Sequence, residues 1–231
     1  MKNTLLRVVA LLVVGVPAAQ AQFSSTITAV SDYDFRGVSL SAKDPAIQAS
    51  ADYAFSNGFA IGAWASNVDF GDDADYELDL YANYTGKIND TFSWTAGIVH
   101  YQWDSTVVGD YAEAFVGFSA GDFGFKQWYA DDYGDLGVGA WYTEANYTVS
   151  LSDAFSLSFH AGYNYGDYWK DFGFGEMIDY SVGLGYTAGN FNLGLKFTGT
   201  DASGAQKVTA DVFNNEPRVY VSVATTLPWG E

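Results

Sequence analysis

The stretch FSLSFHAGYNY, residues 155–165, decides the fold. Its odd-numbered positions carry Phe, Leu, Phe, Ala, Tyr and Tyr, whereas Ser, Ser, His, Gly and Asn stand between them. Successive side chains of a strand point to opposite faces, so this alternation predicts a β-strand with one apolar and one polar face. An amphipathic helix would need apolar residues every three or four positions, and this stretch lacks that spacing.

The same alternation recurs along the chain, most clearly in residues 178–187 and 191–198. An even strand number is typical of single-chain bacterial barrels. The pattern predicts twelve strands, at 26–36, 46–55, 58–68, 75–85, 91–103, 110–119, 122–130, 137–151, 154–165, 177–188, 190–199 and 217–228.

The connections between these strands alternate in length. Short turns are predicted at 56–58, 86–90, 120–121, 152–153 and 189. Longer polar loops are predicted at 37–45, 69–74, 104–109, 131–136, 166–176 and 200–216. Short periplasmic turns and longer extracellular loops are typical of outer-membrane barrels. We therefore predict an all-β fold, a transmembrane up-and-down antiparallel β-barrel with both termini on the periplasmic side.

A soluble barrel or sandwich is the alternative, because its strands also alternate. It would turn the apolar face inward, and 17 Tyr, 17 Phe and 7 Trp would crowd that interior. In a membrane barrel the rings at strand ends form girdles at the two interfaces. The predicted girdle residues are Tyr33, Phe35, Phe55, Tyr84, Phe92, Tyr163 and Tyr165.

The N-terminal segment 1–21 has the features of a cleaved secretory signal. Lys2 and Arg7 give the segment a positive start, residues 5–16 form an apolar run, and Ala19-Gln20-Ala21 follows as a small-residue exit. An anchor helix is the alternative, but the run is shorter than the ~20 residues that span a bilayer. We predict export by the Sec route, with residues 22–231 forming the barrel in the outer membrane.

The charge balance limits the partners. The chain has 10 basic and 28 acidic residues and a formal net charge of −18. Phosphate backbones repel such a surface, so we expect no nucleic acid. The chain has no Cys, which excludes disulfides and thiol ligands. We expect no cofactor or metal, and as partners small solutes, outer-membrane lipid, lipopolysaccharide and the barrel-assembly machinery; the oligomeric state is left open.

The polar positions between the apolar ones should line the lumen. Lys126 is a less certain member of this set. The candidates are Asp32, Asp34, Arg36, Gln48, Asp52, Glu77, Asp79, Glu113, Glu144, Asp179, Lys196 and Arg218. Because carboxylates outnumber bases, the lining favours cations. We predict a porin-like channel for passive diffusion of small hydrophilic solutes with weak cation preference. A narrow substrate-specific channel and a closed, non-conducting barrel are the alternatives.

Two features bear on whether the lumen is open. Inward glycines leave space, which argues against complete filling: Gly62, Gly97, Gly162, Gly183, Gly185 and Gly194. The cluster of Asp32, Asp34 and Arg36 is the best candidate for a constriction. An ion-pair network that holds the first loop explains these three residues equally well.

Two other chemistries are weighed and set aside. The acidic loops, such as 69–75 and 131–135, lack the ordered spacing of a calcium loop, so a solvated acidic rim is the better interpretation. A membrane phospholipase would need a histidine beside a serine nucleophile. His160 is predicted to point into the lumen, whereas Tyr101 and Gln102 follow His100. We therefore predict that the protein is not an enzyme.

The N-terminal third carries a resemblance to a known family. Its residues are SDYDFRGVS (31–39), PAIQ (45–48), GF (58–59), WASNVDF (64–70) and ELDLY (77–81). This series, dense over 26–86, resembles the TorF family of porin-like outer-membrane proteins and implies a barrel far more strongly than a substrate. Outer-membrane proteins commonly end on an aromatic residue, whereas Gly230 and Glu231 end this chain, so we expect Trp229 to take that role.

Overall fold

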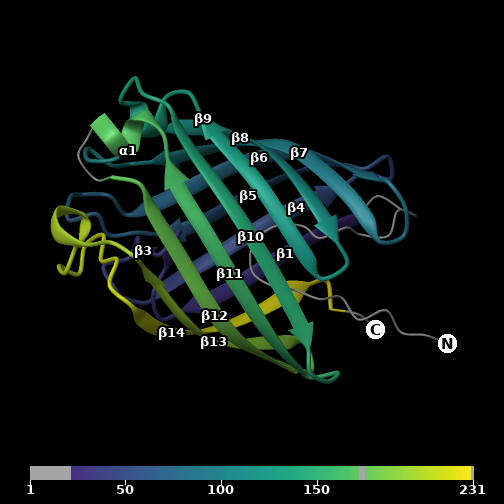
Figure 1. Ribbon diagram of the computed structural model, residues 1–231. Helices are drawn as coiled ribbons and strands as arrows, with labels where there is room; N and C mark the ends of the chain where they lie inside the picture. Colours follow the sequence, from purple (N-terminus) through teal and green to yellow (C-terminus); the bar gives the residue numbers. More distant parts are fainter. Residues whose placement is uncertain (1–21, 172–174, 230–231) are drawn as a thin grey trace.

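The strands form one closed wall. In the computed structural model, which describes residues 22–171 and 175–229, twelve strands close into a barrel in the order β1-β14-β13-β12-β11-β10-β9-β8-β7-β6-β5-β4 (Figure 1). Every neighbouring pair is antiparallel, and β1 closes on β14 from Ser25 opposite Leu227 to Val30 opposite Ser222. A closed sheet pairs its backbone groups internally and leaves no edge facing lipid. The predicted fold class is confirmed.

The wall strands follow the predicted ranges closely from residue 46 onward, within three residues at each end. Their bounds are β1 Gln22–Val30, β4 Ala46–Ala54, β5 Phe59–Asn67, β6 Tyr76–Lys87, β7 Phe92–Trp103, β8 Tyr111–Ala120, β9 Phe123–Ala130, β10 Ala140–Ser150, β11 Phe155–Tyr165, β12 Met177–Ala188, β13 Phe191–Thr200 and β14 Arg218–Leu227.

The first predicted strand, 26–36, is wrong at both ends. β1 begins at Gln22 and ends at Val30, and the chain then leaves the wall. Residues 34–39 form a separate small hairpin from β2 (Asp34–Phe35) and β3 (Val38–Ser39). Arg36 and Gly37 have positive φ angles of 50° and 82°, which reverse the chain instead of extending it.

The remaining short elements lie in the longer connections. They are η1 (Tyr133–Asp135), α1 (Asp167–Asp171) and η2 (Gly204–Gln206). In Figure 1 these connections gather at one end of the barrel, and the start of β1 and the end of β14 lie at the other. We call these the loop end and the turn end. No helix among the described residues is long and apolar enough to cross a membrane.

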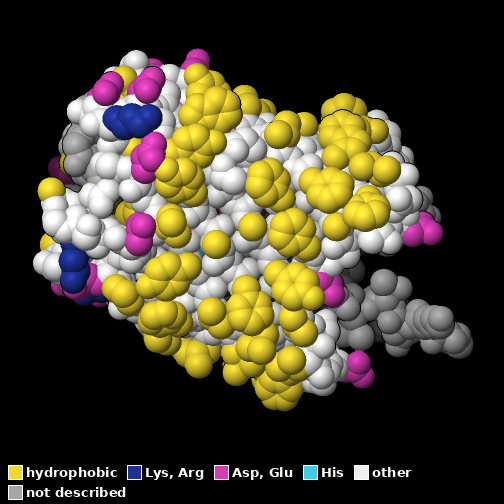
Figure 2. Space-filling model, viewed as in Figure 1, with side chains coloured by type: hydrophobic (Ala, Val, Ile, Leu, Met, Phe, Trp, Pro, Cys, Tyr) yellow, Lys and Arg dark blue, Asp and Glu magenta, His cyan; other side chains and the backbone are white. Residues whose placement is uncertain are grey.

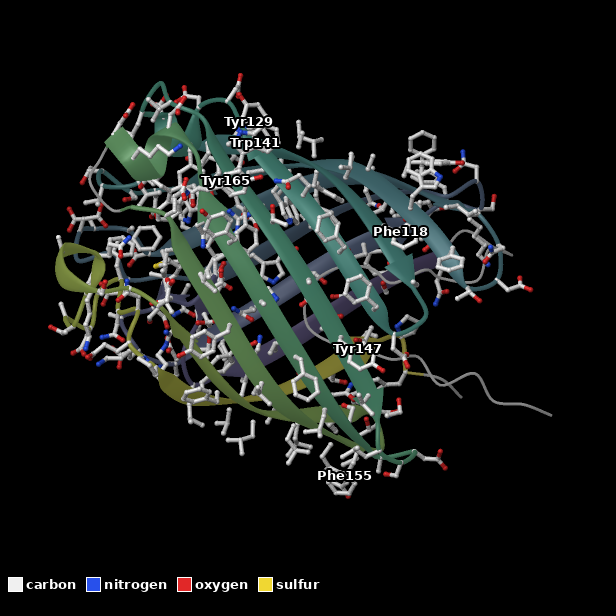
Figure 3. All side chains as sticks on the ribbon, in the orientation of Figure 1. Phe118, Tyr129, Trp141, Tyr147, Phe155 and Tyr165 are labelled. Carbon is white, nitrogen blue, oxygen red and sulfur yellow. The ribbon has the colours of Figure 1, made fainter. Side chains whose placement is uncertain are left out.

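The outer surface of the barrel is apolar. Figure 2 shows hydrophobic side chains spread over the wall, and Val182, Leu184 and Leu195 are among those exposed there. Figure 3 shows outward rings in two groups: Tyr129, Trp141 and Tyr165 towards the loop end, and Phe118, Tyr147 and Phe155 towards the turn end. An apolar band between two aromatic girdles is the surface of a membrane-spanning barrel. The soluble alternative is wrong, because the polar face points inward.

Two of the predicted girdle residues are misplaced. Tyr33 is only 4% exposed and packs with Leu40 inside the barrel, and the ring of Phe35 lies 6.1 Å from that of Tyr101. Both belong to the segment that leaves the wall after β1. Phe55, Phe92 and Tyr163 are exposed at strand ends, as predicted. The predicted signal peptide, 1–21, lies outside the described residues.

Candidate functional site in the barrel lumen

A hairpin folds back into the barrel between β1 and β4. Phe35 pairs with Val38, so Arg36 and Gly37 form a two-residue turn with both φ angles positive, as in a type I′ turn. A Cβ added to Gly37 would lie 2.5 Å from Cγ2 of Thr200 on β13 and 2.9 Å from Cβ of Asp179 on β12. The tip of the hairpin is therefore pressed against the inner wall.

The guanidinium of Arg36 at this tip binds β8. Its Nη1 and Nη2 donate to Oε1 and Oε2 of Glu113 over 3.0 and 2.5 Å. The two side chains are only 8% and 1% exposed. Tyr101 also donates to Glu113 over 3.1 Å, and the ring of Tyr142 lies 4.0 Å from the guanidinium carbon. A bidentate pair of this kind fixes both position and orientation.

The base of the hairpin binds β14. Arg218 donates from Nε to Asp32 and from Nη2 to Asp34, each over 2.5 Å, and from Nη1 to the Gly37 carbonyl over 2.8 Å. In the ring of twelve strands, β8 and β14 are six strands apart in either direction. Residues 31–45 thus connect opposite walls, and we call this segment the crossbar.

Apolar packing fills the loop-end half of the lumen around the crossbar. Tyr33 and Leu40 pack with Val68 and Phe70. Phe35 packs against a second cluster on the inner wall, composed of Val99, Tyr101, Tyr111, Phe115, Trp128, Ala130 and Tyr142. Side chains of the crossbar and of the wall therefore occupy the loop-end half of the lumen.

The turn-end half has a different lining. Its inward positions on β11–β14 carry small polar or glycine residues, namely Ser156, Ser158, Gly183, Gly185, Gly194 and Ser222. A Cβ added to Gly183, Gly185 or Gly194 would meet serine hydroxyls at 2.5 to 2.6 Å. This half of β11–β14 is therefore lined by small side chains.

The other three inward glycines do not leave open space, contrary to the prediction. The ring of Tyr81 covers Gly62, that of Phe115 covers Gly97, and that of Tyr142 covers Gly162. In each case a large inward ring on a neighbouring strand occupies the volume that the glycine leaves. These glycines make room for rings and do not keep the lumen open.

Several acidic candidates on the wall have hydrogen-bond partners. Asp52 accepts from Tyr81 over 2.5 Å and from Ser50 over 2.8 Å. Glu144 accepts from Nε1 of Trp128 and from Asn146, each over 2.8 Å. These two carboxylates are anchored without a strong base at hydrogen-bond distance.

Asp179 belongs to a second polar network. Its Oδ1 lies 2.8 Å from Nε2 of His160 and 3.1 Å from the hydroxyl of Tyr142, and Asn164 donates to its Oδ2 over 3.2 Å. Tyr101, Tyr142 and Asn164 were not among the predicted lining residues. They share the inward phase of Glu113, Glu144 and His160, which is the signal that could have found them.

The lysines of the lumen stand apart from the carboxylates. Nζ of Lys126 lies 4.9 Å from the ring centre of Phe115, and that of Lys196 lies 5.8 Å from Tyr220. Within the described residues, neither lysine has a carboxylate oxygen within 4.0 Å. Gln48 lies opposite Thr28 and Ser66, on the inward side of β4. Glu77 and Asp79 lie on the inward side of β6.

The three residues proposed as a constriction, Asp32, Asp34 and Arg36, are all in the crossbar ion pairs. They hold the first loop, as in the alternative interpretation, and their role as a constriction stays a prediction. The two histidines do not resemble a hydrolase centre. His100 faces outward, and Nδ1 of His160 lies 2.8 Å from Asn146 rather than beside a serine.

The acidic loops carry hydrogen bonds between loops. Asp72 accepts from the amide of Thr106 over 2.7 Å and from Ser105 over 2.8 Å. These bonds lower the pKa of Asp72 to about 2, with the Thr106 amide as the largest cause. The described residues contain no group of three acidic, histidine or cysteine side chains arranged to hold a metal ion.

Comparisons agree with the barrel. The chain belongs to Gcw_chp, a family described as bacterial proteins of unknown function, whose model matches residues 15–227. The TorF resemblance stays a prediction. No protein with a curated description is similar in sequence to this chain.

Three solved structures share the fold at low identity. The KdgM porin is 12% identical with a TM-score of 0.59 and covers 90% of this chain and 99% of its own. The NanC porin is 11% identical with a TM-score of 0.57, and the match covers 89% of this chain and 98% of NanC. Omp33 of Acinetobacter baumannii is 10% identical (TM-score 0.53; 91% and 99% covered). The chain is therefore similar to porins in fold and is an outer-membrane β-barrel.

Proposed function

We propose that the protein is a porin-like channel for passive diffusion of small hydrophilic solutes, with weak cation preference. The observation that carries this proposal is the inner wall, whose turn-end half is lined by small polar side chains and whose loop-end half is crossed by one charged segment. A barrel of twelve strands lies between filled eight-stranded barrels and open sixteen-stranded porins.

The charge of the lumen supports the cation preference. Its bases are Arg36, Lys126, Lys196 and Arg218, and its acids are Asp32, Asp34, Asp52, Glu77, Asp79, Glu113, Glu144 and Asp179. Arg36 and Arg218 are already bound to carboxylates in the crossbar. The remaining excess of acids attracts cations and lowers the local concentration of anions.

A narrow, substrate-specific channel is the second candidate. The packed loop-end half favours it, because a solute must pass beside the crossbar and contact named side chains there. A closed barrel with a structural role is the outcome if the crossbar never moves. One solved KdgM complex contains disordered oligogalacturonate, a polymer of acidic sugars. The acid excess of this lumen argues for a different solute class.

Outer-membrane lipid, lipopolysaccharide and the barrel-assembly machinery are the partners that this proposal implies. Trp229 is the proposed aromatic signal for assembly; its Nε1 donates to Thr225 over 2.8 Å. Normal assembly of a Trp229→Ala variant would contradict that role.

Solute flux into liposomes tests the channel. Refolded mature protein in liposomes should admit small neutral and cationic solutes, with rates that fall as solute size increases and that exceed those of anions of similar size. Rates that saturate for one solute and are low for all others would support the specific channel. No flux through a correctly folded barrel would support the closed one.

A further inference from the structure

Two acidic side chains at the loop end of β6 have no basic partner. Glu77 and Asp79 are consecutive inward residues of β6 and are 1% and 8% exposed. Within the described residues, no Lys or Arg nitrogen lies within 4.0 Å of either carboxylate. The guanidinium of Arg36, which belongs to the same half of the lumen, is occupied by Glu113.

Each carboxylate also has one oxygen without a hydrogen bond. Oε2 of Glu77 and Oδ1 of Asp79 are buried and have no hydrogen-bond partner. Burial of an ionised carboxylate is strongly unfavourable unless a positive charge or a donor compensates it. Two such groups on one strand face call for a positive charge or a shared proton, and within the described residues no Lys or Arg beside them supplies the charge.

Aromatic rings surround the pair. Trp103 lies opposite Glu77 on β7, while Trp64 on β5 and Tyr101 on β7 flank Asp79. The ring of Tyr33 from the crossbar lies 5.4 Å from that of Trp64. The faces of aromatic rings attract ammonium groups. Two carboxylates with such walls have the chemistry of an ammonium site.

We propose that Glu77 and Asp79 bind a small ammonium cation at the loop end of the lumen, between β6 and the crossbar. This inference rests on the proposed function, because it places a station for the solute on its path. It adds a substrate class: solutes that carry an ammonium group. The crossbar takes part through Tyr33, so occupancy of the site and the position of the crossbar are linked.

The test is the unfolding midpoint of the refolded full-length mature protein in detergent, because a ligand of the folded state raises that midpoint. Ammonium chloride should raise it saturably, whereas sodium chloride at the same ionic strength should not. The rise should be lost in Glu77→Gln and in Asp79→Asn. Asp52→Asn is the matched control and should retain it, because Asp52 has Tyr81 and Ser50 as partners.

Two results would overturn the site. One is an ammonium effect that is absent from the wild type or persists in both variants. The other is an infrared carbonyl band of a protonated carboxyl that is present at neutral pH in the wild type and disappears in Glu77→Gln. Such a band would show that Glu77 and Asp79 share a proton and need no bound cation. Circular dichroism confirms folding of each variant. The unfolding midpoint is measured without any ion current. A barrel that carries no current but is still stabilised by ammonium would therefore contradict the proposed channel and support the proposed ammonium site.

Discussion

Glu113 on β8 and Arg218 on β14 stand on opposite walls of the barrel, and one short segment of chain binds both. Arg36 of the crossbar reaches Glu113, and Asp32 and Asp34 reach Arg218. The partners are 77, 186 and 184 residues apart in the sequence. The crossbar thus braces the lumen and divides its packed loop-end half from the more open turn-end half.

Removal of the Arg36 guanidinium should destabilise the barrel. Arg36→Met leaves Glu113 buried without its base, so the free energy of unfolding should fall by about 3 kcal/mol. Adding Glu113→Gln should restore part of the loss. Denaturant titration in detergent measures both. Lys43→Met is the control: its pair with Asp211 is exposed, and less than about 1 kcal/mol should be lost. Equal losses in the two single variants would contradict the buried brace.

Gly37, at the tip of the crossbar hairpin, should tolerate a larger side chain poorly. Gly37→Ala places a methyl group 2.5 Å from Thr200 and also imposes a positive φ on alanine. We expect a loss of about 2 to 4 kcal/mol from the two effects together. Gly71→Ala shares the positive φ but meets nothing closer than 3.5 Å, so it should lose only about 1 kcal/mol. Similar unfolding midpoints for both variants would show that the hairpin tip does not press on β13.

A charged side chain on the lipid-facing side of the wall should destabilise the barrel. Val182 points outward near the middle of β12, and Val182→Arg should cost about 2 to 4 kcal/mol of folding free energy in lipid vesicles. Ser222→Arg on the inward side of β14 should cost much less, because its side chain lies in the polar lumen. The reverse order of stabilities would mean that the two faces of the wall have been exchanged.

The link between the loops at Asp72 and Thr106 should depend on pH. The pKa of Asp72 is lowered in the folded state, so the link contributes stability above the unfolded pKa near 4 and loses it as pH falls through about 2. Amide hydrogen exchange at Thr106 should be slow at pH 5 and should speed up in Asp72→Asn. Unchanged protection in that variant would contradict the link.

Charge changes at the lumen wall should shift ion selectivity in opposite directions. Asp52→Asn removes an acid and should lower the preference for cations, whereas Lys196→Gln removes a base and should raise it. Both side chains lie on the inward side of the wall and outside the crossbar ion pairs. Reversal potentials under a salt gradient measure the shifts. Shifts of the same sign would contradict the assignment of one of the two residues to the conduction path.

Local alternation was enough to predict the wall but not the crossbar. Residues 155–165 alternate because lipid and lumen impose opposite polarity on successive side chains, and β11 occupies that range. Tyr33 and Phe35 alternate in the same way, but their rings pack inside the barrel. Tyr33 and Phe35 lie inside the barrel because the chain turns at Arg36 and Gly37 and because ion pairs hold this segment across the lumen. The alternation of polar and apolar residues carries no information about ion-pair partners that are so distant in sequence.

The sequence predicted which acidic residues point into the barrel better than it predicted which side chains they contact there. Strand phase placed Glu77, Asp79, Glu113 and Glu144 on the inner wall, where the structure has them. Whether they line an open path stays a prediction. The alternation along the strands could not show that Glu113 binds the guanidinium of Arg36 whereas Glu77 has no basic partner among the described residues. These contacts depend on which loop enters the barrel.

Single-channel current through the refolded mature protein in a planar bilayer shows whether the barrel conducts ions. Under a salt gradient we expect steady current steps with a reversal potential of the sign that cations produce. A folded barrel that carries no current would contradict the channel, and a reversal potential of the opposite sign would contradict the acidic lumen.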